Sequence, residues 1–264
     1  MTLNIPLLNR LTPKDVILIS LLIILVPSAL AVDIRLVWLQ VVVSCSVAVA
    51  ADIGLNFLKK TKFFFPKAGL ITGLIIALVL PLSVNPLVAL FASLIAILSK
   101  QLIRLERRHV FNPATFGLVA SGLIFKIPFG WWGDSIPWLV ILLGIVTIIR
   151  AKKELQTAGF IVTYVLVQYL FLRTSASGDL VSLKIALGTI PWFFAFFMVP
   201  EPMTSLFPYR LTPLFGFIAA LAAINLSLIK FTPISNNSLL LGLLLANLVA
   251  FGYFYLQRRE TKAQ

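Results

Sequence analysis

The sequence predicts an all-α integral membrane protein, and two observations support this fold class. Hydrophobic residues make up 60% of the 264 residues and charged residues only 12%, about half the charged share of soluble domains. The Lys and Arg residues also fall in short clusters between apolar runs, which is how membrane topology is encoded. We therefore expect a single polytopic membrane domain over residues 1–264, surrounded by a lipid bilayer.

A net charge of +13 could also indicate a nucleic-acid partner. The basic residues, however, lie at the ends of apolar runs, where anionic lipid head groups are the expected partners. We therefore expect the chain to bind no nucleic acid.

About ten transmembrane helices are expected, because a span needs roughly 20 apolar residues. The predicted spans are 15–32, 36–58, 68–84, 86–104, 110–126, 135–150, 156–173, 181–200, 210–229 and 237–256. The third and fifth are short and have prolines at or near one end, a pattern typical of discontinuous helices.

The distribution of basic residues predicts the orientation of these spans. With the N-terminus in the cytoplasm, 17 Lys and Arg residues fall in inner segments and 4 in outer segments, and Lys184 within a span completes the 22. Such a bias follows the positive-inside rule, so we expect a plasma (cell inner) membrane protein with both termini cytoplasmic. The first apolar run also resembles a cleavable signal peptide, but it is longer than the usual 7–15 residues, which favours an uncleaved anchor.

Ten spans divide into two sets of five, and an odd number of spans inverts the second set relative to the first. We therefore expect a 5+5 inverted-repeat architecture, with residues 1–126 and 135–256 as the halves and 257–264 as a short cytoplasmic tail. No residue-level repeat is evident. Trp131, Trp132 and Trp138 flank the outer loop between the halves and are expected in an aromatic belt.

Asp52 and Asn56 lie near the inner end of the second span and share one helix face, because they are four residues apart. In one interpretation Asp52 pairs with Lys59 or Lys60 at the interface. In the other, Asp52 and Asn56 join Glu201 in an ion pathway, since polar groups in hydrocarbon are costly unless they have a role.

One cysteine, Cys45, and one histidine, His109, limit the redox and metal chemistry of the chain. A bis-His haem needs two axial histidines, and iron–sulfur or zinc sites need several Cys or His ligands. We expect no metal, haem or iron–sulfur cluster. His109 follows a basic stretch and is expected to be solvated at the inner surface.

Two segments indicate more than a membrane span. In the first, 107–115, Asn112 and Pro113 follow a basic stretch and predict an N-cap and a first helical residue, whose free N–H groups can attract an anion. In the second, 197–205, two prolines flank Glu201 and predict a helix break. The topology places both segments on the inner side.

These segments resemble the family of membrane subunits that includes RnfD and NqrB. Three motifs carry the resemblance: Leu80-Pro81 through Asn85-Pro86, the FNPA motif of residues 111–114, and the segment 196–205. Together they cover about 70 to 230. The resemblance implies a ten-helix inverted-repeat fold shared with urea transporters, and a role in ion-translocating, flavin-containing electron-transport complexes.

The chain departs from this family in two places. The loop 127–134 has no threonine and no SGAT-type sequence, which in the family carries covalent FMN, so no covalent FMN is expected. The aspartate of the family's "TDP" motif is Glu201 here, with Pro200 before it. The chain thus resembles a shortened, divergent member of the family.

The resemblance implies a membrane subunit of an oxidoreductase complex that depends on other redox subunits of flavin or ferredoxin type. Such a subunit would bind FMN or riboflavin non-covalently, or only shape an ion path. The residues implied to bind the cofactor are Phe111, Asn112, Pro113, Ala114, Thr115, Glu201, Pro202, Thr204 and Ser205. The alternative is a channel or transporter for a small solute or ion, of urea-transporter-like fold and without a redox role.

Overall fold

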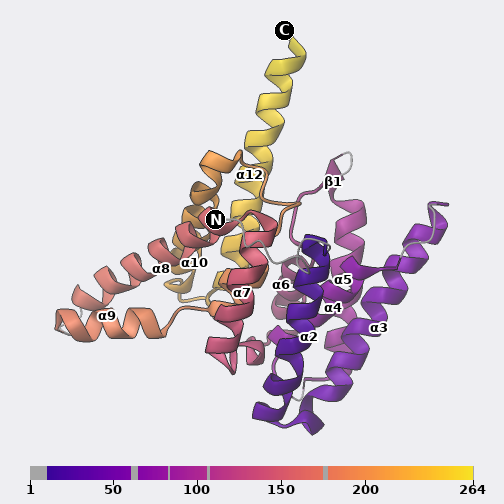
Figure 1. Ribbon diagram of the computed structural model, residues 1–264, viewed down its shortest axis with the longest axis horizontal. Helices are drawn as coiled ribbons and strands as arrows, with labels where there is room; N and C mark the ends of the chain where they lie inside the picture. The colour runs from indigo at the N-terminus through magenta and orange to yellow at the C-terminus, as the bar shows by residue number, and fades with distance from the viewer. Residues whose placement is uncertain (1–10, 61–64, 83, 106–107, 175–177, 264) are drawn as a thin grey trace.

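The computed structural model describes residues 11–60, 65–82, 84–105, 108–174 and 178–263, and it is 79% helical. Figure 1 shows the arrangement. The longer helices are α2 (Pro13–Val32), α3 (Ile34–Leu58), α4 (Lys67–Val79), α5 (Pro86–Leu102), α6 (Pro113–Phe125), α7 (Pro137–Ala151), α8 (Glu154–Thr174), α9 (Asp179–Gly188), α10 (Thr212–Ser227) and α12 (Ser238–Ala263). The short elements are β1 (Arg104–Leu105), β2 (Arg108–His109), η1 (Trp132–Asp134), the π-turn η2 (Phe194–Met198), η3 (Tyr209–Leu211) and α11 (Thr232–Ser235).

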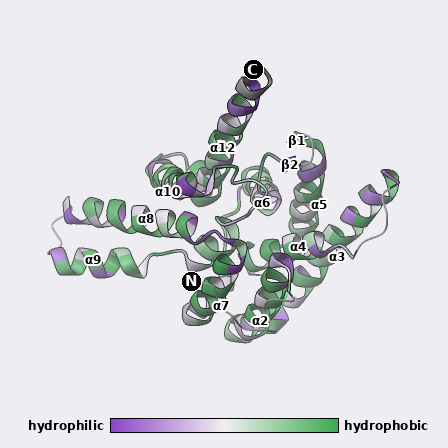
Figure 2. Cartoon of the chain, turned by 45° about the horizontal axis from the view of Figure 1, so that its top comes forward, coloured by the Kyte–Doolittle hydropathy of each residue, from purple (hydrophilic) through white to green (hydrophobic). Residues whose placement is uncertain are grey.

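Five of the described helical segments are long and apolar enough to cross a membrane. They are Pro13–Val32, Ile34–Leu58, Glu154–Thr174, Tyr209–Ser227 and Ser238–Arg259. Only 22–39% of the most apolar stretch of each is buried within the protein, so most of their hydrophobic side chains face outward. Apolar residues accordingly cover much of the ribbon surface in Figure 2.

α4 and α6 are among the described helices that are too short to cross a bilayer. α4 and α6 have 13 residues each, which is about 20 Å of helix against a hydrocarbon core of roughly 30 Å. α4 ends at Leu80 because Pro81 follows, and α6 begins at Pro113. Both are mostly buried, so these short helices lie inside the protein rather than on its surface.

The predicted span 181–200 is not one helix. α9 ends at Gly188, the backbone leaves the helix before Pro191, and a second helical stretch runs from Trp192 through η2. Pro191 has no N–H to donate to the preceding turn, and Pro200 and Pro202 end the second stretch. The prolines thus produce a broken helix where the hydropathy pattern predicted a continuous one.

The two predicted halves have similar helix contacts. α3 packs against α5 and α5 against α6 in the first half, while α8 packs against α10 and α10 against α12 in the second. α2 contacts α4, and α7 contacts η2. Between the halves, α2 contacts α7 and α6 contacts α12.

A residue-level correspondence, which was not evident in the sequence alone, accompanies these contacts. A Cβ built on Gly117 of α6 would lie 2.2 Å from the carbonyl oxygen of Ala92 and 2.8 Å from Cβ of Ala96, and one built on Gly242 of α12 would lie 2.7 Å from both the Ala219 oxygen and the Ala223 nitrogen. Gly242 stands 125 residues after Gly117. Each glycine therefore lets one helix approach a pair of alanines four residues apart.

The same spacing recurs where α6 crosses α12. The backbone N–H of Asn112 donates to Oδ1 of Asn247 over 3.0 Å, and a Cβ on Gly122 would lie 2.3 Å from Oδ1 of Asn237. Asn237 and Asn247 stand 125 residues after Asn112 and Gly122 respectively. Asn112 at the start of α6 therefore contacts α12 at Asn247, and Asn237 at the start of α12 lies against α6 at Gly122. The start of each helix lies against a later position of the other, so the two helices run antiparallel.

The segment 127–136 between the halves folds inward, against the expectation of an exposed outer loop. Trp132 is only 3% exposed, and its Nε1 donates to the carbonyl oxygen of Ala77 over 2.7 Å. Trp138 is 69% exposed. The aromatic-belt prediction is therefore wrong for Trp132, because its indole fills space at the end of α4.

Candidate functional site

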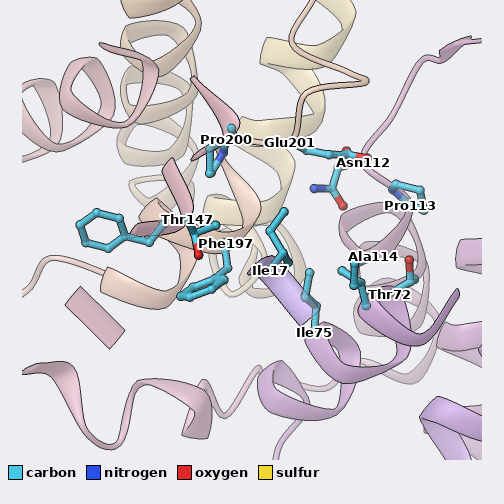
Figure 3. Close-up of a pocket in the computed structure, with 13 residues that line it drawn as sticks. Ile17, Thr72, Ile75, Asn112, Pro113, Ala114, Thr147, Phe197, Pro200 and Glu201 are labelled. Carbon is cyan, nitrogen blue, oxygen red and sulfur yellow. The ribbon is translucent and has the colours of Figure 1, made fainter. Parts of the chain in front are cut away.

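A small cavity lies between the two predicted halves, beside α4 and the start of α6 (Figure 3). It is lined by residues of α2, α4 and α6 from the first half and of α7, η2 and the turn after η2 from the second. The lining residues are Ile17, Ile71, Thr72, Ile75, Asn112, Pro113, Ala114, Thr147, Ala151, Phe196, Phe197, Pro200 and Glu201. About 60 Å³ is open to the centres of water-sized spheres, which is room for about four waters.

Asn112 connects the two halves at this cavity. Its Oδ1 accepts from the backbone N–H of Thr115, which is the predicted N-cap bond, and its Nδ2 donates to the carbonyl oxygen of Met198 over 3.2 Å. Asn112 is 3% exposed. The start of α6 is therefore bonded directly to the end of the broken helix from the other half.

Glu201 follows that helix end and forms the polar rim of the cavity. Its Oε1 lies 2.9 Å from Nε2 of His109, and its Oε2 accepts from Oγ1 of Thr204 over 2.9 Å. His109 is 8% exposed, so the expectation of a solvated histidine is wrong: the short β1–β2 hairpin folds the ring onto Glu201. The carboxylate has both a titratable partner and a hydroxyl donor.

Lys153 adds a buried cation beside this pair. Its Nζ donates to Oγ of Ser205 over 2.6 Å and to the Ser205 carbonyl oxygen over 3.3 Å. Burial lowers the pKa of Lys153 to about 8, with the positive charge of Arg108 acting in the same direction and Glu201 opposing it. An amine with this pKa can change its charge near neutral pH.

Several polar atoms in the helices around this site are buried without a partner in the described part of the chain. Gln156 donates through Nε2 to the carbonyl oxygen of Val199 over 2.6 Å, but its Oε1 is unsatisfied, as are Oγ1 of Thr115 and Nδ2 of Asn247. Buried polar atoms are normally bonded to protein or water. These donors and acceptors can therefore bind water, an ion or a small polar solute.

The structure brings together most of the residues implied to bind a cofactor. Asn112, Pro113, Ala114 and Glu201 line the cavity, and Thr204 contacts the Glu201 carboxylate. Other members of the predicted set lie beside it rather than in its lining. Phe111 packs on Phe116, the backbone of Thr115 is capped by Asn112, Pro202 is exposed, and Ser205 contacts Lys153.

The predicted ion-pathway residues do not form one site. Asp52 is 4% exposed and accepts from Nζ of Lys100 over 3.0 Å; it pairs with neither Lys59 nor Lys60 in the described contacts. Neither Asp52 nor Asn56 lines the cavity. Helix α5 packs along α3 and brings Lys100 to Asp52, a contact between distant segments that local spacing could not reveal.

Sequence reasoning missed His109, Lys153, Gln156 and Asn247 as site residues. Lys153 was counted only among the inner basic residues, and the two amides belong to predicted spans. All four side chains are buried close to a helix break. Burial of this kind cannot be predicted from a single sequence. Among the described residues, no group of three or more His, Cys, Asp or Glu side chains could hold a metal ion.

Comparison with known proteins does not identify a family for this chain. No protein-family model matches the chain, and none of the curated proteins matches it.

Proposed function

We propose that the chain is a ten-span membrane subunit of an RnfD/NqrB-like electron-transport complex, in which an ion moves between two inverted halves past Glu201. The observation that carries the proposal is that the short helix α6 of the first half meets the broken helix of the second half at a polar cavity. Transporters with inverted repeats place their ion and substrate sites at such helix breaks.

The equal spacing of three contact positions supports the inverted halves. Gly117, Asn112 and Gly122 of the first half correspond to residues 125 positions later, and the contacts of α6 with α12 are exchanged by that correspondence. Two unrelated helices would have no reason to share this register.

The grouping of helix ends supports the predicted orientation. Arg150 at the end of α7 donates to the carbonyl oxygen of Leu11 before α2, and Arg108 lies over the ring of Phe254 in α12. In Figure 1 the ends of α3, α5 and α12 point to the top and right, whereas the α2–α3 turn lies at the bottom. This arrangement supports the predicted separation of inner and outer segments.

Glu201 is the residue best placed to bind the ion. Its side chain is 22% exposed and lines the cavity. A cation bound at Glu201 would compete with Nε2 of His109 for the carboxylate.

The cavity does not fit a flavin. Its 60 Å³ is far below the roughly 300–1,000 Å³ of typical cofactor and ligand pockets. We therefore assign no flavin step to this chain, and non-covalent FMN or riboflavin stays a prediction from the resemblance.

A second candidate function is a channel or transporter for a small neutral solute, without a redox role. The cavity volume favours it, because about four waters is also the size of a small polar solute. Oε1 of Gln156 and Nδ2 of Asn247, which have no partner in the described chain, add an unsatisfied acceptor and donor in the helices that surround the cavity.

Reconstitution of the purified protein in liposomes separates these functions. A cation-selective flux that is lost in Glu201→Gln, together with co-purification of flavin- or ferredoxin-type subunits from native membranes, is the expected result. A flux of small neutral solutes that Glu201→Gln leaves unchanged would favour the second function. Leak-free liposomes with every ion and solute tested would contradict both.

A further inference from the structure

Segment 127–136 contacts both α4 and the broken helix that contains η2, on the side of the cavity away from Glu201. The backbone N–H groups of Gly130 and Trp131 donate to the carbonyl oxygen of Val79 over 2.9 and 3.2 Å, and the Trp132 indole donates to Ala77. On the other side, the Trp131 ring meets that of Phe194 edge-on at 5.9 Å.

The segment lies about one helical turn beyond the cavity, both on α4 and on the broken helix. On α4 the cavity is lined by Ile71, Thr72 and Ile75, while the segment binds residues 77–79. On the broken helix, Phe196 and Phe197 line the cavity, while the segment contacts residues 192–194. The segment therefore lies just beyond the cavity along both helices, on the side away from Asn112 and Glu201.

The fit of this segment is close. A Cβ on Gly130 would lie 2.8 Å from Cα of Pro81, and one on Gly133 would lie 2.9 Å from Cβ of Leu78. Trp131 has a φ of 49°, a conformation that is unfavourable for a bulky residue. Contacts with α4 and the broken helix, rather than its own backbone preference, keep the segment in place.

Asp134 attaches the segment to the broken helix. Its carboxylate accepts from the backbone N–H groups of Trp192 and Phe193, and burial raises its pKa to about 6. Its Oδ1 is buried and has no partner in the described chain. A carboxylate accepts roughly twice as strongly as a neutral group, so protonation weakens this attachment.

No charged side chain offsets the charge of Asp134 from the helices packed on η1. These helices are α2, α4 and α7. Their charged residues are Lys14, Asp15, Lys67 and Arg150, all in the turns at the far, inner ends. Asp33 and Arg35 at the α2–α3 turn and Lys126 before the segment are the next charged residues along the chain, and none of them is among the causes of the raised pKa of Asp134.

We propose that residues 127–136 form the outer gate of the pathway and that Asp134 is its proton-binding residue, whose protonation releases the gate from the broken helix. This inference rests on the proposed pathway between the halves. It assigns the outer side a control that is separate from the ion site at Glu201.

Thiol labelling tests the gate. In a Cys45→Ser background, Ile75→Cys places one cysteine at the cavity wall, and a membrane-impermeant maleimide is applied to one side of the membrane at a time. From the side of the α2–α3 turn, the labelling rate should rise about tenfold between pH 7 and pH 5, as expected for control by a single proton. An exposed Arg35→Cys normalises for the pH dependence of the thiol reaction.

Asp134→Asn should label rapidly at both pH values, because the amide cannot carry the charge. The matched control Asp33→Asn, an exposed carboxylate beside the α2–α3 turn, should behave like the parent. Trp132→Phe removes the indole N–H and should raise labelling at pH 7 while keeping the pH response. A pH-independent rate in the parent, or no change at pH 7 in both Asp134→Asn and Trp132→Phe, would overturn the gate.

Labelling from the opposite side separates this inference from the proposed function. If Ile75→Cys reacts from the inner side but never from the outer side, the gate assignment is wrong and the inner cavity stands. If it reacts from neither side, the cavity is not part of a pathway, and the proposed function fails as well.

Discussion

Replacing Asn112 by leucine should destabilise the contact between the two halves more than any nearby substitution that keeps the helix cap. The side chain has two separate bonds: Oδ1 caps Thr115, and Nδ2 reaches the carbonyl oxygen of Met198. Asn112→Leu removes both, whereas Asn112→Ser keeps a capping oxygen and loses only the bond to Met198.

The magnitude follows from these two bonds. Loss of an N-cap costs about 1 kcal/mol, and leaving the Met198 oxygen buried without its donor costs about 1–3 kcal/mol. Asn112→Leu should therefore lose about 2–4 kcal/mol, and Asn112→Ser about 1 kcal/mol less. At roughly 2–4 °C per kcal/mol for a chain of this size, the leucine variant should melt about 4–16 °C lower.

Thermal unfolding of the detergent-purified variants, followed by size-exclusion chromatography of what stays soluble, measures this difference. Asn225→Leu is a suitable control, because the Asn225 side chain is exposed and bonds only within α10. A melting temperature of Asn112→Leu within 1–2 °C of the parent would mean a loss of unfolding free energy below about 1 kcal/mol. In that case Asn112 does not join the halves, and the site built around it is wrong.

Three further predictions concern the helix contacts and the charges of the site. Gly117→Val and Gly242→Val should each destabilise by about 1–3 kcal/mol through overpacking, whereas Gly252→Val, where nothing lies within 4 Å of a Cβ, should melt like the parent. Burial lowers the pKa of Lys153 to about 8, so above that pH the folded protein binds fewer protons than the unfolded chain. The stability of the parent relative to Lys153→Met, measured by melting curves, should therefore rise as the pH increases beyond 8. Glu201→Gln should abolish at least nine-tenths of any cation flux into liposomes while the protein elutes at the parent volume; an unchanged flux would return Glu201 to a structural role.

The sequence predicted the helices well, because long apolar runs and prolines act locally. Every predicted span overlaps a described helix, and Asn112 caps α6 as its position before Pro113 suggested. The prolines near Glu201 also end a helix where expected. Hydropathy, capping and proline chemistry depend on near neighbours, so a single chain is enough to reveal them.

Contacts between distant segments were beyond this approach. Asp52 pairs with Lys100 rather than with its neighbours, and His109 is buried against Glu201, 92 residues away. The inward fold of Trp132 likewise depends on the carbonyl groups that α4 leaves free at its end. Such partners are set by helix packing, which hydrophobic periodicity does not specify.

The proposed repeat could not be predicted from residue identities for a related reason. The positions that correspond in the two predicted halves are small residues at helix crossings and asparagines at helix starts. Gly117 and Gly242 are recognisable as equivalent only after the structure shows that each faces two alanines. In membranes, close helix approach depends on such small residues, while lipid-facing positions can vary freely among apolar types.

The sidedness of the α6 and α12 starts tests the inverted arrangement most directly. In a Cys45→Ser background, single cysteines at Arg108 and Asn236, both exposed, mark the positions just before these helices. A membrane-impermeant thiol reagent added to intact cells should label Asn236→Cys and leave Arg108→Cys unlabelled until the membrane is opened. Labelling of both from the same side would contradict two inverted halves and the pathway between them.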